Sequence, residues 1–417
     1  MKTSLLTAAL IAWTLPAWTQ TSREVSSGTL TLDQALDLTE RANPEILATH
    51  RKWDAAHQRV RQAATPDKPR LDIERMYAPS AGNVVSGADE KSLSVTQEFP
   101  FPSTLYHRRG VAVSEAAMAE QSYRAKVREV LARARSTYAM LYLSQKSLEI
   151  LGENIEVMRR FSKVAESKYV AGHAGQSDAL KAQVELTKML NMNVVLISDK
   201  ESAQAMLNAI MGREARAPVG EALEPESPPL TETLDALESS ALADRPELRE
   251  ARFGAERARK SLSLARSEFL PEFMLQYRRR TDSMRGTTHD GIVGLSLPLW
   301  FWKPAAMVAE AKADKEMSEA ELDAMRLETL AELRSTFVRA QTSRRLAETY
   351  RTSVLPQAEE ALNVADSGYQ ADKASFLDLL DAQRSLLGFR LEYYQYQAEY
   401  QTRLAELERA VGRRVTP

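Results

Sequence analysis

The feature that most constrains the fold of this chain is an internal repeat at a shift of about 200 residues. The run from Ser167 to Gln183 reappears as the run from Ser367 to Gln383, and eight of the 17 positions are identical. Chance composition would give roughly one identity. A period of this length is far longer than that of a solenoid. The chain is therefore a tandem pair of units rather than an array.

The repeat divides the chain into two units, residues 20–211 and 231–417, joined by a linker at 212–230 that contains four prolines. Residues 1–19 are predicted to be a signal peptide, because Lys2 precedes an apolar stretch and a small-residue cleavage site. That stretch is too short for a membrane-spanning helix and is broken by Pro16. We expect the mature chain to leave the cytoplasm.

Each unit contains two segments in which apolar and polar residues alternate. These segments lie at about 70–78 and 91–99 in the first unit and at about 272–280 and 291–299 in the second. A period of two is typical of half-buried strands. Leu93, Val95 and Phe99 all fall on one side of the clearest segment. The sequence therefore predicts four strands in two hairpins.

A long helical hairpin is predicted after each pair of strands, at 103–211 and at 304–411. These segments are rich in Ala, Leu, Glu, Arg and Lys, which are strong helix formers. A helix of about 65 residues is roughly 100 Å long, which no compact domain of this size accommodates. Pro356 is expected to kink its helix or to mark a joint. The predicted fold class is mainly α with a small β part.

Composition excludes several classes of function. The 55 Lys and Arg are balanced by 57 Asp and Glu, so the chain lacks the basic footprint of a nucleic-acid binder. Cysteine is absent, which excludes disulfides, thiolate metal sites and cysteine nucleophiles. The sequence contains no phosphate-binding glycine loop, nucleophile elbow or metalloprotease helix. We therefore predict no enzyme, no catalytic residues, no bound metal and no cofactor.

The predicted strand hairpins need partners for their edges, whereas helices satisfy their own backbone hydrogen bonds. Open strand edges in lipid would leave backbone groups unpaired, so four strands must close with copies of themselves. Three chains would give a 12-stranded barrel in the outer membrane, continued by a helical barrel in the periplasm. A soluble periplasmic adaptor or a coiled-coil scaffold would also explain the helices. Both alternatives leave the apolar faces of the strands uncovered.

The chain resembles the TolC family of outer-membrane efflux proteins. The duplicated unit and the paired motifs at 180–183 and 380–383 carry the resemblance, which covers essentially the whole mature chain. Two further motifs, at 94–100 and 355–362, are most similar to the heavy-metal-efflux branch. The resemblance implies a passive homotrimeric exit channel for metal cations. An exit duct for drugs, other organic compounds or peptides is the alternative within this class.

The resemblance also implies partners and a location. Such channels lie in the outer membrane, in contact with its lipid, and their helices extend into the periplasm. They join a periplasmic adaptor protein to an inner-membrane pump, commonly a proton-driven pump of the RND type. The entrance lies where the paired helices turn back, which in this chain is at 171–177 and 371–376.

Site residues at this entrance follow from the same resemblance. Asp378 and Asp381 match the acidic rings that close the entrance of family members, and their spacing of three places them on one helix face. Six carboxylates in a trimer would make a cation-selective, pH-sensitive constriction. The alternative is that these are ordinary solvated residues, or first-turn acids favoured by the helix dipole.

Adaptor contacts are expected at the tips themselves. The expected contact residues are Tyr169, Gly172, Tyr369, Asp372 and Lys373. Two departures from the family pattern stand in the second tip, where Asp372 replaces a glycine and Ala374 replaces a basic latch residue. A tyrosine such as Tyr369 on an apolar stripe is also typical of helix packing.

Overall fold

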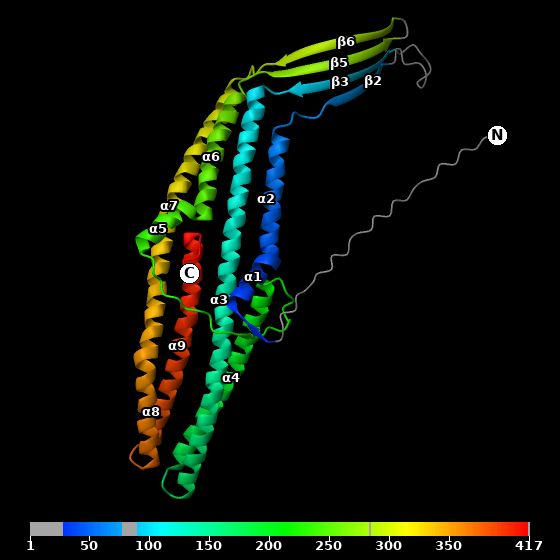
Figure 1. Ribbon diagram of the computed structural model, residues 1–417. Helices are drawn as coiled ribbons and strands as arrows, with labels where there is room; N and C mark the ends of the chain where they lie inside the picture. Colours follow the sequence, from blue (N-terminus) through cyan, green and yellow to red (C-terminus); the bar gives the residue numbers. More distant parts are fainter. Residues whose placement is uncertain (1–27, 77–89, 283–284, 416–417) are drawn as a thin grey trace, which may run out of the picture.

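Each half of the chain folds into a strand hairpin and a long helical hairpin, and the two halves lie side by side (Figure 1). This computed structural model describes residues 28–76, 90–282 and 285–415. The predicted signal peptide and the loop between the first two strands lie outside the described residues. The predicted fold class, mainly α with a small β part, is confirmed.

The four strands form one antiparallel sheet in the order β2-β3-β5-β6. The strands are β2 (Arg70–Met76), β3 (Glu90–Phe99), β5 (Glu272–Asp282) and β6 (Gly286–Ser296). Pairing of β3 with β5 joins the two units, with Val95 opposite Tyr277. Alternation within each strand could not predict this pairing. Among the described strands, β2 and β6 each have one edge without a partner.

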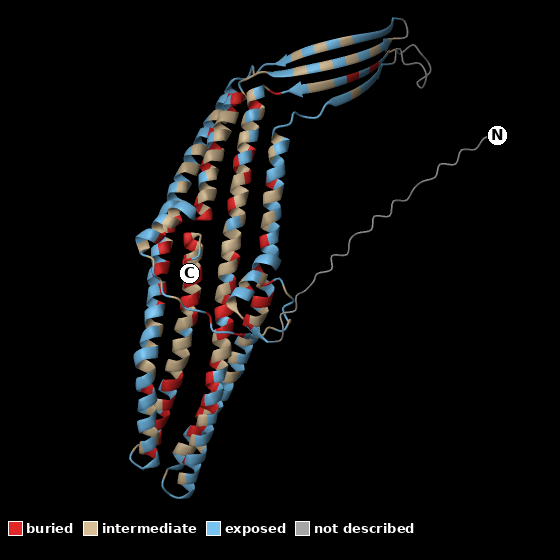
Figure 2. Ribbon diagram, in the orientation of Figure 1, coloured by how far each residue is buried: buried red, intermediate tan, exposed pale blue. Residues whose placement is uncertain are grey.

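The sheet has two chemically distinct faces, because side chains alternate along each strand and the register has no slip. The apolar face carries large exposed side chains, among them Ile73 (69% exposed) and Val293 (78% exposed). The polar face carries hydroxyl and charged groups such as Ser94, which lies opposite Arg278. In the protein on its own, nothing covers the apolar face of the described strands (Figure 2).

Helices of very different regularity form the two hairpins. The first hairpin consists of α3 (Pro102–Val170) and α4 (Gln176–Ile210). The second consists of α7 (Trp302–Thr349), a π-helical turn η1 (Tyr350–Val354), α8 (Leu355–Gln370) and α9 (Phe376–Val411). Helix α3 runs without a break for 69 residues, or about 100 Å.

The interruption in the second hairpin lies where proline predicts it. Pro356 has no N–H to donate to the carbonyl of Thr352, and the π-helical turn directly before it absorbs the mismatch. The expected joint is therefore present. At the matching position of the first hairpin stands Glu156, and α3 continues through it.

Four shorter helices pack alongside the long helices α3 and α7 (Figure 1). They are α1 (Leu32–Ala42), α2 (Pro44–Ala63), α5 (Leu234–Asp244) and α6 (Pro246–Ser267). Helices α1 and α2 follow each other directly in the chain and are separated at Asn43. The Asn43 side chain accepts hydrogen bonds from the N–H groups of Glu45 and Ile46 and donates one to the Ile210 carbonyl (2.8 Å). It therefore starts α2 and ends α4 at one point.

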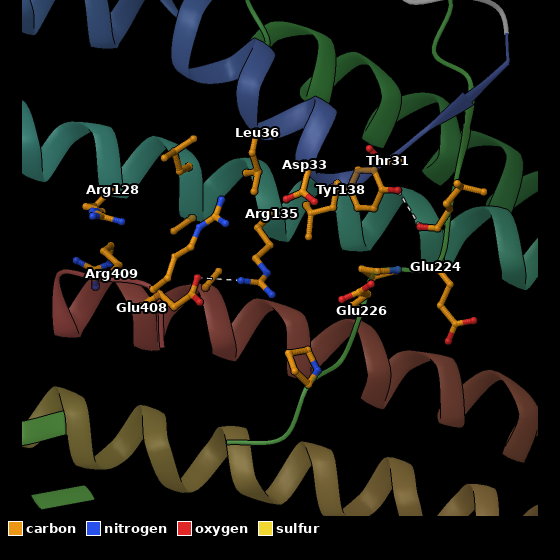
Figure 3. Close-up of a pocket in the computed structure, with 18 residues that line it drawn as sticks. Thr31, Asp33, Leu36, Arg128, Arg135, Tyr138, Glu224, Glu226, Glu408 and Arg409 are labelled. Carbon is orange, nitrogen blue, oxygen red and sulfur yellow. Dashed lines mark hydrogen bonds and ion pairs between the residues drawn. The ribbon is translucent and has the colours of Figure 1, made fainter. Parts of the chain in front are cut away.

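The linker between the units contains a strand that the sequence did not predict. Strand β4 (Glu221–Ala222) pairs in parallel with β1 (Thr29–Leu30). The buried Tyr138 hydroxyl lies 2.8 Å from the Leu223 carbonyl and fastens the linker to α3 (Figure 3). Beneath the linker is a cavity of about 380 Å³, crossed by an ion pair between Arg135 and Glu408 (2.8 Å). This pair joins α3 to α9.

Across the described residues, every helix is too short or too polar to cross a membrane.

Candidate functional site at the hairpin tips

The two tips have the same backbone geometry at the end of the molecule far from the sheet (Figure 1). Gly172 has φ +77° and Asp372 has φ +59°, so both adopt the left-handed conformation. The N–H of Gly172 donates to the Tyr169 carbonyl (3.0 Å), and that of Asp372 donates to the Tyr369 carbonyl (3.3 Å). Each long helix therefore ends in the same kind of turn.

This geometry accounts for the glycine that the second tip lacks. Glycine adopts a left-handed conformation without steric cost, and Asp is among the few other residues that tolerate it. Asp372 is the one non-glycine residue with positive φ in the described chain. The substitution keeps the turn and adds a carboxylate.

That carboxylate makes a contact between the hairpins. The Nζ of Lys168, from α3, lies 2.6 Å from Asp372 Oδ1 and 2.5 Å from the Tyr369 carbonyl oxygen. It also lies 4.5 Å from the centre of the Tyr369 ring. The Lys168 ammonium holds the pKa of Asp372 below its usual value. One cation of the first hairpin thus satisfies the last turn of α8 and an acidic residue of the second hairpin.

Below this contact the second tip is packed tightly. Tyr369 is 5% exposed and Phe376 is 1% exposed, with ring centroids 5.4 Å apart. Burial raises the pKa of Tyr369. In this conformation the Tyr369 ring supports the tip from beneath. The corresponding Tyr169 of the first hairpin is 43% exposed and available for contact.

Asp378 takes part in capping the N-terminus of α9. Its carboxylate accepts hydrogen bonds from the Ser375 hydroxyl (2.7 Å) and the Ser375 N–H (3.0 Å), while the Asp378 N–H donates to the Ser375 hydroxyl (3.2 Å). This is a reciprocal capping box. These bonds, led by the hydroxyl, lower the pKa of Asp378. Asp378 is therefore ionised and fixed in orientation.

Asp381 lies one turn further along the same exposed face of α9. Its carboxylate is 3.6 Å from Arg384, which also pairs with Glu185 of α4. The pairing with Arg384 lowers the pKa of Glu185. The structure thus brings Asp378 and Asp381 together on one face, as their spacing predicts. Arg384 joins this face to the first hairpin.

The sequence identified the acidic residues but missed the groups that hold them. These groups, which cap the tips or bind across them, are Lys168, Ser375, Arg384 and Glu185. A serine three residues before an acid is a recognisable capping signal. The contacts of Lys168 and Arg384 depend on packing between the hairpins, which no local pattern encodes.

The remaining predicted contact residue, Lys373, lies exposed in the turn of the second tip. Its counterpart in the first tip is His173, which is exposed as well. The two tips therefore present different side chains at the same position of the turn.

No group of three or more His, Asp or Glu residues suited to hold a metal ion occurs within residues 28–76, 90–282 and 285–415. The site is built from two repeated helical hairpins whose tips present charged side chains at the end far from the sheet.

The family follows from comparison with known proteins. The family model described as "Outer membrane efflux protein" matches residues 35–213 and again 237–413, so the chain belongs to this family. The predicted relationship to the TolC family is confirmed. The protein is an outer-membrane efflux channel whose helices lie in the periplasm, and proteins of this family are passive channels rather than enzymes.

Individual proteins are similar to this chain over nearly its full length. Cobalt-zinc-cadmium resistance protein CzcC of Cupriavidus metallidurans is 25% identical over 403 residues, covering 93% of this chain and 91% of that protein. A membrane protein from Pseudomonas aeruginosa has a similar structure, with a TM-score of 0.80, 19% identity and coverage of 92% and 90%. The structure of CusC gives a TM-score of 0.79 at 16% identity and covers 92% of each chain.

Proposed function

We propose that three copies of this chain form the exit channel of a tripartite efflux system for heavy-metal cations. Members of the family are trimeric channels that work with an adaptor and an inner-membrane pump. For this chain we propose a homotrimer, a periplasmic adaptor and a pump of the RND type. The observation that carries the proposal is the sheet, which has an apolar face and two unpaired edges.

Closure of the sheet follows from those edges. Each unit, 20–211 and 231–417, contributes two strands, and the β6 edge of one copy can pair with the β2 edge of the next. Three copies would give 12 strands with the apolar faces outward to lipid and the polar faces towards a wet lumen. The helical hairpins, which leave the sheet in one direction (Figure 1), would continue the lumen through the periplasm.

The entrance of this channel is proposed to lie at the tips. Asp378 and Asp381 share one exposed face of α9, and the capping bonds keep Asp378 ionised. Three copies would bring six carboxylates around the axis and favour cations over anions. The residues proposed to meet the adaptor are the exposed Tyr169, Asp372 and Lys373. Gly172 shapes the turn of the first tip, and Tyr369 packs beneath the turn of the second.

Heavy-metal cations are proposed as cargo on two grounds. CzcC is named for resistance to cobalt, zinc and cadmium, and this relative aligns over 93% of the chain. The acidic face of α9 suits cations. A water-filled lumen discriminates weakly, so organic compounds or peptides are the alternative outcome of the test.

The test is metal and dye accumulation in a strain from which the gene for this chain alone is deleted. We expect cell-associated cobalt, zinc or cadmium to rise several-fold in the deletion strain and to fall when the wild-type gene is restored. Purified protein should run as a trimer in detergent. If metal content stays unchanged while an exported dye or peptide accumulates, the cargo assignment is wrong. A monomer in detergent would contradict the channel itself.

A further inference from the structure

The charges of the sheet are sorted between its faces. Every acidic residue of strands β2, β3, β5 and β6 lies on the polar face. These residues are Asp72, Glu74, Glu90, Glu98, Glu272, Asp282 and Asp290. The apolar face carries no described carboxylate, yet it does carry cations. Alternation alone does not require this separation, since a strand can place either sign on either face.

The cations of the apolar face gather at one end of it. Arg75 and Lys91 lie directly opposite each other on β2 and β3, and Arg279 lies opposite Leu93 one row closer to the helices. His289 is the partner of Arg279 on β6. All four side chains are exposed. They form a basic row, defined as Arg75, Lys91, Arg279 and His289, at the end of the sheet far from the helices (Figure 1).

Neighbouring arginines of β5 show that this arrangement is not a general property of the strand. Arg278 and Arg280, which point to the polar face, pair with Asp290 (3.3 Å) and Glu90 (2.7 Å). Arg279 between them has no carboxylate partner among the described residues, and neither have Arg75 and Lys91. Within the described strands, the cations of the polar face are paired with carboxylates, whereas no described carboxylate pairs with the cations of the apolar face.

An aromatic pair borders the basic row. The Tyr277 hydroxyl lies 2.6 Å from His289 Nδ1, and the two rings stack with centroids 6.0 Å apart. Tyrosine is enriched where apolar and aqueous layers meet, since its ring suits the first and its hydroxyl the second. Val95 lies directly opposite Tyr277 on this face, and Leu275 and Phe273 follow along β5 towards the helices. Along β5 the order on this face is therefore Phe273 and Leu275, then Tyr277, then Arg279.

This order has a defined direction in the cell. The helices lie in the periplasm, so the end of the sheet that joins them is the inner end and the basic row is at the outer end. Lipid-facing bands of outer-membrane proteins end at an interface where head groups begin. Exposed cations at such a level attract anionic head groups.

We propose that the basic row binds the phosphate groups of lipids in the outer leaflet of the outer membrane. Arg279 and Arg75 can each donate two parallel N–H bonds to a phosphate, and Lys91 adds a point charge. No described residue of this face carries a carboxylate that would repel the phosphate. Three copies around a trimer would give a ring of such sites, which would fix the height of the channel in the membrane.

The proposal rests on closure of three sheets as described above, and the occupant it requires is lipid. Edge pairing between copies uses β2 and β6 and leaves the apolar faces open. The polar face cannot serve the same purpose, because its cations already have partners. Charge complementarity therefore selects a phosphate-bearing lipid over an uncharged one.

The test is lipid retention by the purified full-length trimer in detergent, counted by native mass spectrometry. Probes are lipid A with two phosphates, the same lipid after dephosphorylation, and phosphatidylethanolamine. The triple variant Arg75→Gln/Lys91→Gln/Arg279→Gln should retain far less of the phosphorylated lipid than wild type. The expected loss is about fivefold for each cation removed. The matched control Arg278→Gln/Arg280→Gln, on the same strand but on the opposite face, should retain it like wild type.

Two further measurements keep the outcome decisive. The same spectra report the trimer mass, so failure of the trimer is separated from failure of lipid binding. If the triple variant does not assemble, Arg279→Gln is compared with Arg279→Lys, which keeps the charge and should keep most of the lipid. Equal retention in the triple variant and wild type would overturn the proposal. So would equal retention of the dephosphorylated lipid, or an equal loss in the polar-face control.

Discussion

The two hairpin tips share their backbone and differ in what fastens them. Both turns place a left-handed residue at the same position, Gly172 in the first and Asp372 in the second. Helix α4 begins after Gly175 without a side-chain cap, whereas α9 begins with the capping box of Ser375 and Asp378. The first tip is a minimal turn. The second tip is capped, packed and tied to its neighbour.

From this difference we infer that the two repeated units have different mechanical roles at the tips. The helices of the second hairpin combine a π-helical joint with a tightly held end, so a change of shape at the joint can move the tip as one piece. The unbroken α3 provides a straight support beside it. We infer that the entrance is set by the second hairpin against the first.

The largest expected effect comes from the packed residue that the first tip lacks. Phe376→Ala should destabilise the second tip by about 3–5 kcal/mol, because it empties a site that is 1% exposed. Gln176→Ala at the matching, exposed position should change little. Hydrogen exchange of the 371–380 amides measures this effect. Equal protection in both variants would mean that packing does not distinguish the tips.

The contact between the tips is tested by Lys168→Met, which removes the donor to Asp372 and to the Tyr369 carbonyl. The chain has no cysteine, so spin labels on His173→Cys and Lys373→Cys report the tip separation without background. We expect an additional, longer distance in this variant. Lys181→Met, which removes a cation that pairs within the first hairpin, should leave the distance distribution unchanged.

The same labels test the pH dependence of this contact. Because Lys168 lowers the pKa of Asp372, the ion pair is fully present above the unfolded-state pKa of the carboxyl and is lost only as pH falls through the lowered folded-state value. The tip separation should therefore stay constant between about pH 5 and pH 8 and change only in stronger acid. A transition near neutral pH would show that another group controls the separation.

A smaller effect is expected at the left-handed glycine. Gly172→Ala places a Cβ where no heavy atom lies within 4 Å, so the cost comes from φ +77° alone. That cost is about 1–2 kcal/mol. Faster hydrogen exchange confined to the 171–177 turn would agree with it. Unchanged exchange there would mean that the turn of the first tip relaxes to another shape.

The smallest effects concern the caps. Ser375→Ala should cost the second tip about 1 kcal/mol, whereas Gly175→Ser should stabilise the first by a few tenths of a kcal/mol. Helix-start amides at 176–179 and 376–379 report both changes by hydrogen exchange. Opposite signs in the two tips would support the comparison, and equal signs would contradict it.

Much of this fold could be predicted because it is local and repeated. The alternation of Leu93 and Val95 marks a strand, and the long segment that ends at Tyr169 has the composition of a helix. Pro356 marked the joint by its missing N–H. The helix break at Asn43 could also have been read, since Asn before Pro is a strong start signal.

Contacts between distant segments could not be predicted in the same way. Pairing of β3 with β5 depends on how the two units dock against each other. The alternation of apolar and polar residues within each strand is equally compatible with other strand orders. In the sequence, Lys168 looks like an ordinary solvated lysine. Only the structure shows that its ammonium donates a hydrogen bond to the end of α8. For the candidate site, the acidic residues of α9 could be predicted from the sequence. The groups that orient them were found only in the structure.

The most direct test of the proposed entrance is single-channel conductance in planar bilayers. Asp378→Asn/Asp381→Asn removes the proposed ring charges, while the new amide oxygen at the start of α9 can still accept the N–H bond of Ser375. Asp178→Asn is the matched change in the first hairpin. We predict that the double variant loses most of its cation selectivity and its block by divalent cations, and that Asp178→Asn keeps both. Unchanged selectivity in the double variant, or an equal loss in Asp178→Asn, would contradict the assignment of the entrance to the second hairpin.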